Sequence, residues 1–224
     1  MALHRRTCHK VPGPRTGPRP GARCGRRGAT TSVAAVQPTT TPVQPTGPAI
    51  PHAGGVSHEE FRAAMSRLAA GVVLVTAHEP ADDPEGPRGE DVGMTATAFL
   101  SVSLDPPLVL VSLRNGSRMD DLLAEQPLWA VSVLSESQRH IAGRFAMKGR
   151  ISDRLLFEDI PHVRGEVSGA LLVGGALALL ECRTEQRVSA GDHTLVIGRV
   201  LTARVPTAGG GPLTYFRGRY RKLD

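Results

Sequence analysis

The sequence is poor in cysteine, with three in 224 residues. Cys8 and Cys24 stand near the start of the chain, and Cys182 is alone in an apolar stretch. This pattern excludes a disulfide framework, and the spacing does not fit a metal cluster held by cysteines. We therefore expect no metal site, and a protein that works in the reduced cytoplasm.

Long apolar runs are also absent. A helix that spans a bilayer needs about 20 mostly apolar residues, and no run in the sequence approaches that length. A secretory signal needs an apolar run of about seven residues or more after its first basic residues, and none occurs before Val56. The sequence therefore predicts neither a membrane partner nor secretion.

Acidic residues are missing from the first 55 positions, which hold eight Lys and Arg among many Pro, Gly and Thr. Such a segment buries too little apolar surface to offset the entropy of ordering, so residues 1–55 are predicted to be a disordered basic tail. Residues 56–224 then carry 19 basic and 21 acidic side chains, a net charge near −2. We expect no specific nucleic-acid partner, because the tail has no aromatic residue and offers only nonspecific electrostatics.

Short apolar segments follow one another through the predicted domain, residues 56–224, in the rhythm of a β-barrel. They are residues 72–76, 94–102, 108–113, 128–134, 176–182 and 193–205. Short helices are expected after Ser57, Ser117 and Ser135, where capping residues precede an apolar face. The stretch from His78 to Asp91, with three prolines and six acids, is expected to form an exposed hairpin loop. The sequence thus predicts a mainly β fold with a few short helices.

A Rossmann dinucleotide site is excluded, because no G-x-G-x-x-G follows a strand and the elements do not alternate as β, α, β. One candidate for ligand binding is the stretch from Gly93 to Pro107. Its hydroxyls, at Thr95, Thr97, Ser101 and Ser103, recur at or near every second residue, which on one strand places them on one face. Such a row suits the ribityl and phosphate oxygens of a flavin nucleotide. An ordinary strand with a solvated face remains the alternative.

Two further stretches carry candidate chemistry. In residues 114–120, a turn leads to a helix capped by Ser117, and Arg118 adds positive charge in its first turn, a combination that binds phosphate. In residues 191–198, a turn delivers His193 to the first position of a strand, where its imidazole can donate a hydrogen bond into a cleft. Simple capping and a structural histidine are the alternatives. Neither stretch pairs a nucleophile with a base.

Five segments together resemble the short-chain flavin reductases, the reductase components of two-component flavin-dependent monooxygenases. The segments are residues 61–76, Gly93-Met94-Thr95-Ala96, Ser101-Val102-Ser103-Leu104-Asp105-Pro106-Pro107, Gly191-Asp192-His193 and Tyr215-Phe216-Arg217-Gly218-Arg219-Tyr220. They occur in the same order and span nearly all of residues 57–222. The resemblance implies a homodimer of FMN-binding split barrels of Greek-key type, with the flavin at or near the dimer interface.

The resemblance also implies an activity. A hydride passes from NADH or NADPH to FMN or FAD, and the reduced flavin serves a separate monooxygenase. Residues implied to hold the flavin are Thr95, Ala96, Thr97, Ala98, Phe99, Ser101 and Val102, with Gly116, Ser117 and Arg118 at its phosphate and Phe145, Ala146 and Lys148 at its border. His193, the candidate catalytic residue, is implied to meet the nicotinamide nucleotide together with Tyr215, Phe216 and Arg217. Its role is to position the nucleotide rather than to transfer a proton.

Two rival functions remain open within this prediction. One is a flavoprotein that retains FMN and oxidises a bound organic substrate. The other is a flavin-binding protein without turnover. The preferences between FMN and FAD and between NADH and NADPH also remain open, since no acid or arginine follows a Rossmann strand to read the ribose.

Overall fold

The structure of the chain is a computed structural model that describes residues 55–81, 89–147, 153–207 and 210–223, all within one compact unit of residues 52–224. The predicted tail lies outside the described residues except for Gly55, so its disorder stays a prediction. Lys148 and the tip of the predicted hairpin loop, residues 82–88, also lie outside them.

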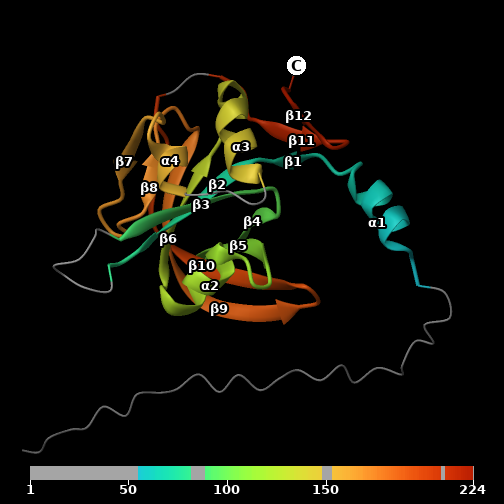
Figure 1. The fold of residues 1–224 in the computed structure, drawn as a ribbon, viewed down its shortest axis with the longest axis horizontal. Coiled ribbons are helices and arrows are strands. Elements are labelled where there is room, and N and C mark those ends of the chain that lie inside the picture. Colours follow the sequence, from blue (N-terminus) through green and yellow to red (C-terminus); the bar gives the residue numbers. More distant parts are fainter. Residues whose placement is uncertain (1–54, 82–88, 148–152, 208–209, 224) are drawn as a thin grey trace, which may run out of the picture. The chain divides into compact units, whose positions relative to one another are not determined.

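The largest element is a seven-stranded sheet in which every neighbouring pair is antiparallel (Figure 1). Its strands, in spatial order, are β3 (Glu90–Ala96), β2 (Val73–Glu79), β6 (Leu128–Val133), β9 (Ala178–Ala190), β10 (His193–Arg204), β5 (Pro107–Arg114) and β4 (Phe99–Leu104). The prediction of a mainly β fold is confirmed. Among the described strands, β3 and β4 remain edges, so the sheet is not closed into a barrel.

Two small sheets, which the sequence analysis did not anticipate, complete the β structure. One contains β1 (Ala70–Gly71), β11 (Thr214–Phe216) and β12 (Arg219–Arg221), and the other pairs β7 (His162–Arg164) with β8 (Leu171–Val173). These strands have two or three residues each, too few to show a two-residue periodicity.

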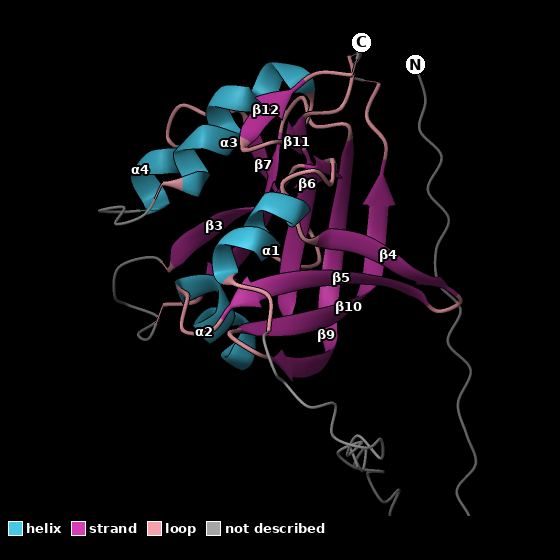
Figure 2. Ribbon diagram, turned by 90° about the vertical axis from the view of Figure 1, so that its right-hand side faces the viewer, coloured by secondary structure: helices cyan, strands magenta, loops and turns pink. Residues whose placement is uncertain are grey.

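The helices are short and follow the predicted caps. They are α1 (His58–Met65), α2 (Arg118–Glu125), α3 (Arg139–Ala146) and α4 (Asp153–Phe157), with a 3₁₀ turn at Glu136–Gln138 before α3 (Figure 2). Ser57 and Glu60 form the predicted capping box of α1, and Ser117 caps α2. The sequence did not indicate α4. None of the helices in the described ranges is long and apolar enough to span a bilayer.

Strand β2 separates two hydrophobic cores because both of its faces are apolar. Alternate residues of a strand point to opposite sides. Val73 and Val75 pack into one core with the fully buried Trp129, whereas Leu74 packs into the other with Phe145. The predicted strand at residues 72–76 is therefore confirmed, and its continuous apolar character is explained by burial on both sides.

The predicted single run at residues 94–102 is wrong. β3 ends at Ala96, the chain bends at Thr97 and Ala98, and β4 begins at Phe99. Because β3 and β4 form opposite edges of the sheet, the hydroxyls of Thr95 and Ser101 do not share one strand face. The alternation of hydroxyls continued across the bend, so periodicity alone did not reveal it.

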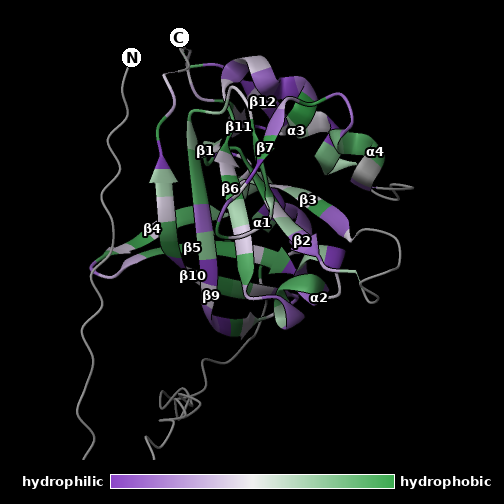
Figure 3. Ribbon diagram, turned by 90° about the vertical axis from the view of Figure 1, so that its left-hand side faces the viewer, coloured by the Kyte–Doolittle hydropathy of each residue, from purple (hydrophilic) through white to green (hydrophobic). Residues whose placement is uncertain are grey.

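The hairpin of β4 and β5 projects sideways as an arm (Figure 2). Hydrophobic residues predominate along these two strands (Figure 3). On edge strand β4, Leu100, Val102 and Leu104 expose 51%, 46% and 91% of their surface. Helix α1 is similar, since Phe61 is 60% exposed and the helix buries no residue. Apolar side chains therefore remain uncovered on both the arm and α1.

Candidate functional site

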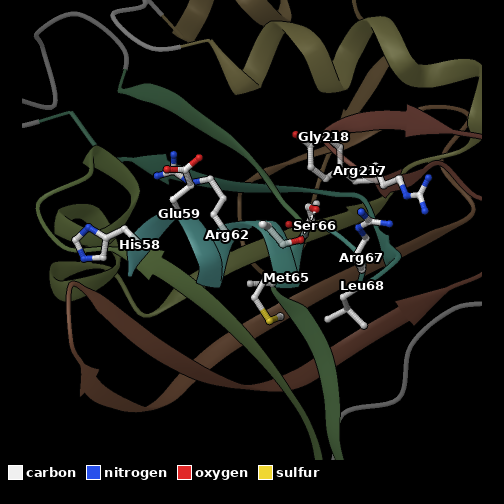
Figure 4. Close-up of a pocket in the computed structure, with 14 residues that line it drawn as sticks. His58, Glu59, Arg62, Met65, Ser66, Arg67, Leu68, Arg217 and Gly218 are labelled. Carbon is white, nitrogen blue, oxygen red and sulfur yellow. Dashed lines mark hydrogen bonds between the residues drawn. The ribbon is translucent and has the colours of Figure 1, made fainter. Parts of the chain in front are cut away.

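A cavity of about 1200 Å³ lies between α1, the Thr97–Ala98 bend and the turn that joins β11 to β12 (Figure 4). Its lining residues are His58, Glu59, Arg62, Ala63, Met65, Ser66, Arg67, Leu68, Ala70, Thr97, Ala98, Tyr215, Arg217 and Gly218. It exceeds the roughly 300–1,000 Å³ typical of small-molecule sites. The cavity therefore has room for a large ligand.

The Thr97–Ala98 bend follows β3, and β3 is held in place by its packing against α3 and α4. A Cβ atom at Gly93 would lie 2.6 Å from the Phe145 ring and 2.8 Å from the Phe157 ring, so only glycine permits this approach. The Thr95 hydroxyl donates to the Ala142 carbonyl of α3 at 3.0 Å. Thr95 therefore ties β3 to α3, whereas Thr97 and Ala98 are exposed toward the cavity.

The turn on the opposite side has an unusual backbone. Arg217 and Gly218 have φ angles of +50° and +73°, and the flanking pair Phe216 and Arg219 is in register, as in a two-residue hairpin of type I′. The Arg217 N–H donates to the Ser66 carbonyl at 2.8 Å. This bond fixes the turn against the end of α1, so α1 and the turn form one connected side of the cavity.

His193 lies outside the cavity lining, where the predicted stretches of residues 114–120 and 191–198 adjoin. Asn115 joins them: its N–H donates to the Asp192 carbonyl at 3.0 Å, its amide donates to Gly191, and its side-chain oxygen accepts from Thr194. The His193 Nδ1 atom is 2.8 Å from the Asp192 carboxylate, and this interaction lowers the pKa of Asp192. The His193 side chain is 41% exposed.

The start of α2 is largely satisfied by its own side chains. Asp120 N–H donates to the Ser117 hydroxyl, and Gly116 N–H donates to the Asp120 carboxylate at 3.2 Å. Arg187 donates to the same carboxylate at 2.6 Å. Of the amide donors that the sequence suggested for phosphate, those of Gly116, Ser117 and Asp120 thus have partners within the chain.

Arg118 is surrounded by carboxylates. Its guanidinium bonds Glu79 at 2.8 Å and Glu90, and Asp153 lies 3.9 Å away. The hydrogen bonds to Glu90 and Glu79 raise the pKa of Arg118. These ion pairs favour a structural role, in which Arg118 joins α2 to the ends of β2 and β3, over the predicted phosphate contact.

The predicted site residues thus fall into three groups, of which the third is spread over several parts of the fold, while Lys148 lies outside the described residues. Thr97 and Ala98 meet Tyr215 and Arg217 at the cavity. Gly116, Ser117 and Arg118 lie with His193 outside its lining. The others are Ala96, Phe99 and Phe145, which are buried or partly buried in the cores, Thr95 against α3, Phe216 beneath the Arg217 guanidinium, and the exposed Ser101, Val102 and Ala146.

The sequence profile of the flavin reductase like domain matches residues 65–224. The FMN reductase (NADH) SmoA of Agrobacterium fabrum is 38% identical over 171 residues, which cover 76% of this chain and 89% of that protein. The chain belongs to the flavin reductase family. The resemblance inferred from the sequence is therefore confirmed.

Other members of the flavin reductase family extend this comparison. The reductase component of 4-hydroxyphenylacetate 3-monooxygenase from Thermus thermophilus is 35% identical over 74% of this chain and 96% of that protein. The structure of the Streptomyces globisporus NADH:FAD oxidoreductase SgcE6, in complex with NAD and FAD fragments, matches 74% of this chain and 92% of that chain. Its TM-score is 0.65, with 35% sequence identity.

The cavity fits the flavin cofactor that the family implies. Ala63, Ala70 and Ala98 provide a small apolar surface for a flat ring, and the Ser66 and Thr97 hydroxyls suit an oxygen-rich chain. Three arginines in the lining suit phosphate, and a single acidic side chain accompanies them. This combination of donor types matches an amphipathic, anionic nucleotide.

The sequence analysis missed the cavity residues of α1 and of the turn that follows it, above all Arg62 in the helix and Ser66 and Arg67 after its end. The helix was expected, but its capping box and apolar periodicity do not show which polar residues face a cavity. Proximity to Arg217, 150 residues along the chain, is created only by the bond between Ser66 and the hairpin turn.

Proposed function

We propose that this protein is an NADH- or NADPH-dependent flavin reductase that transfers a hydride to FMN or FAD. The reduced flavin then serves a separate flavin-dependent monooxygenase. Family membership supports the reaction class, and relatives named as NADH-dependent reductases and as a monooxygenase reductase component support the nucleotide and the partner. The observation that carries the proposal is the cavity where the Thr97–Ala98 bend faces Tyr215 and Arg217.

When bound, the flavin and the nicotinamide supply the hydride chemistry themselves. The chain has to hold both rings in contact and exclude other reactions. Thr97 and Ala98 offer a hydroxyl and a small apolar contact on one wall, while Tyr215 and Arg217 offer a ring and a charge on the other. No acid–base residue is required at the cavity.

His193 is proposed to position the nicotinamide nucleotide. With Nδ1–H donated to the Asp192 carboxylate, the imidazole keeps a defined tautomer and presents Nε2 for a further hydrogen bond. Asn115 holds the turn that carries it. His193 does not line the cavity within this chain, so its contribution depends on how the nucleotide extends or on a second copy.

The active form is proposed to be a homodimer of split barrels of Greek-key type, acting in the cytoplasm. The exposed apolar residues of β4 and α1 support the dimer, because a soluble monomer rarely leaves such residues uncovered together. The cytoplasmic location rests on the cysteine pattern of the sequence.

The proposal is tested by mixing the purified protein with NADH or NADPH and a molar excess of FMN or FAD, while the near-ultraviolet absorbance of the reduced nucleotide is followed. Many turnovers of added flavin are expected. Bleaching of one stoichiometric bound flavin would instead support a flavoprotein that retains its cofactor. Binding without nucleotide oxidation would support a protein without turnover, and either result would overturn the proposal.

A further inference from the structure

The end of the cavity near the β11–β12 turn gathers two arginines from distant parts of the chain. Arg67 follows α1, and Arg217 lies in the turn, with the Ser66 carbonyl bonded to the Arg217 N–H between them. Figure 4 shows both side chains extending to the same side, whereas Arg62 extends toward Glu59. In the described part of the chain, neither Arg67 nor Arg217 forms an ion pair with a carboxylate.

The backbone of Arg217 gives an independent indication of function. Its φ of +50° is a left-handed conformation that favours Gly, Asn or Asp, and Asn followed by Gly is the preferred pair for a type I′ turn. A long cationic side chain is a poor choice for this position on conformational grounds. Strained residues of this kind concentrate at functional sites, where the side chain is needed.

We propose that Arg67 and Arg217 together bind a phosphate group of the nucleotide that occupies the cavity. Two guanidinium groups brought together without a carboxylate repel each other until an anion is bound, and a phosphate accepts several charge-assisted hydrogen bonds from them. This inference rests on the proposed function for the identity of the nucleotide. It moves the phosphate contact from Arg118, which is already paired with Glu79 and Glu90, to the cavity.

The test measures binding by titration calorimetry with oxidised ligands, so that no turnover is needed. The probes are FMN against riboflavin, ADP-ribose against adenosine, and inorganic pyrophosphate. Arg67→Ala and Arg217→Asn are each expected to weaken pyrophosphate by about tenfold to a hundredfold. If the variants also lose affinity for FMN but not for riboflavin, the bound phosphate is that of the flavin. If they lose affinity for ADP-ribose but not for adenosine, it belongs to the nicotinamide nucleotide.

Arg217→Asn separates binding from folding, because it restores the preferred turn sequence. Its melting temperature is expected to equal or exceed that of the wild type while its phosphate affinity falls. Arg67→Lys is expected to recover part of the affinity. The control is Arg204→Ala, which removes an exposed arginine of β10 outside the cavity and should leave pyrophosphate binding unchanged.

Unchanged pyrophosphate binding in both cavity variants would overturn the proposal, as would an equal loss for riboflavin and FMN. A loss in Arg118→Ala alone would return the phosphate contact to α2. These outcomes are distinct from failure of the proposed function, which would appear as a wild-type protein that binds the probes but does not turn over added flavin.

Discussion

At the scale of single residues, His193 is a predicted site residue that makes few contacts with the rest of the chain. Its side chain is 41% exposed, and within the described chain its imidazole contacts the carboxylate of the neighbouring Asp192. A structural histidine would have buried polar partners, which would lose a hydrogen bond if the histidine were removed. The exposure therefore favours a ligand contact over a role in folding.

His193→Ala is accordingly expected to raise the KM for NADH or NADPH and to lower kcat/KM by roughly tenfold to a hundredfold, the equivalent of about 1–3 kcal/mol. Flavin affinity and melting temperature should stay close to wild type. Flavin Kd, melting temperature and nucleotide KM are measured on the same preparation. A depressed melting temperature with a normal nucleotide KM would show that the residue is structural.

Glu181 is a second informative residue, because it is a fully buried carboxylate. One oxygen accepts from the Val167 N–H and from the Ser168 N–H and hydroxyl, and the other accepts from the Thr202 hydroxyl. Burial alone would raise the pKa of Glu181, but the bonds from Ser168, Thr202 and Val167 outweigh it and hold the pKa below its ordinary 4.5. The ionised form is thus favoured by folding.

Because the folded-state pKa is depressed, this contribution to stability is present above the unfolded pKa and is lost as pH falls through the folded value. Glu181→Gln is expected to lower the free energy of unfolding at pH 7 by about 1–3 kcal/mol, since the amide cannot accept all four bonds. Urea titrations should show that the difference in free energy of unfolding between wild type and Glu181→Gln is constant above pH 4.5 and becomes smaller below it. The control is Glu125→Gln, at an exposed position of α2. A difference in free energy of unfolding between wild type and Glu181→Gln that does not change with pH would contradict the account.

At the scale of elements, the packing of α3 and α4 against β3 positions the Thr97–Ala98 bend. The rings of Phe145 and Phe157, 4.7 Å apart between centroids, lie over Gly93. This contact explains on steric grounds why glycine stands first in the Gly93-Met94-Thr95-Ala96 motif. Phe145 itself is buried in this core, so within the described chain it packs against β3, and its flavin contact stays a prediction.

Gly93→Ala is expected to destabilise the fold by about 1–3 kcal/mol, because a Cβ would overlap both rings. Gly143→Ala, in the middle of α3 with no atom within 4 Å of its Cβ position, is the matched control. It should be neutral or stabilising by up to about 1 kcal/mol, since alanine favours helix. Equal effects of the two changes on the free energy of unfolding would refute this steric explanation.

Elements with a local signal were predictable from the sequence. The capping box at Ser57 and the β-branched run at residues 72–76 are encoded by neighbours in the chain, and both formed as expected. The break at Thr97 had no such signal, because it depends on β3 and β4 joining different edges of the sheet. The ion pairs of Arg118 were equally hidden, since Glu79 and Glu90 come from a hairpin far along the sequence.

At the scale of the whole molecule, the uncovered apolar arm leads to a prediction about assembly. Replacing Leu100, 51% exposed on β4, by Lys places a charge in the proposed dimer interface. The expected result is a shift from dimer to monomer in sedimentation or light scattering, because burying an unpaired charge is costly. Leu155→Lys, at a 60% exposed position on α4, is the control. A wild-type monomer, or a Leu100→Lys dimer of normal affinity, would contradict the proposal.

The candidate site itself was only partly predictable. The residues at the bend and the hairpin turn came from the family resemblance, and the structure joins Thr97 and Ala98 with Tyr215 and Arg217 at one cavity. The wall supplied by α1 was not foreseen, because it arises from a tertiary hydrogen bond between Ser66 and Arg217. Motif order therefore indicated the reaction class, while the three-dimensional contacts were needed to locate the cavity.

The central claim is that flavin is reduced in the cavity between α1 and the β11–β12 turn, and filling that cavity tests it most directly. Ala98→Trp adds a large ring to the exposed bend, and Ala124→Trp adds the same ring to an exposed position of α2 outside the lining. The measurement is kcat/KM for FMN with saturating NADH, alongside the melting temperature. The account predicts a loss of about tenfold or more for Ala98→Trp with an unchanged melting temperature, and wild-type turnover for Ala124→Trp. Wild-type turnover by Ala98→Trp would contradict it.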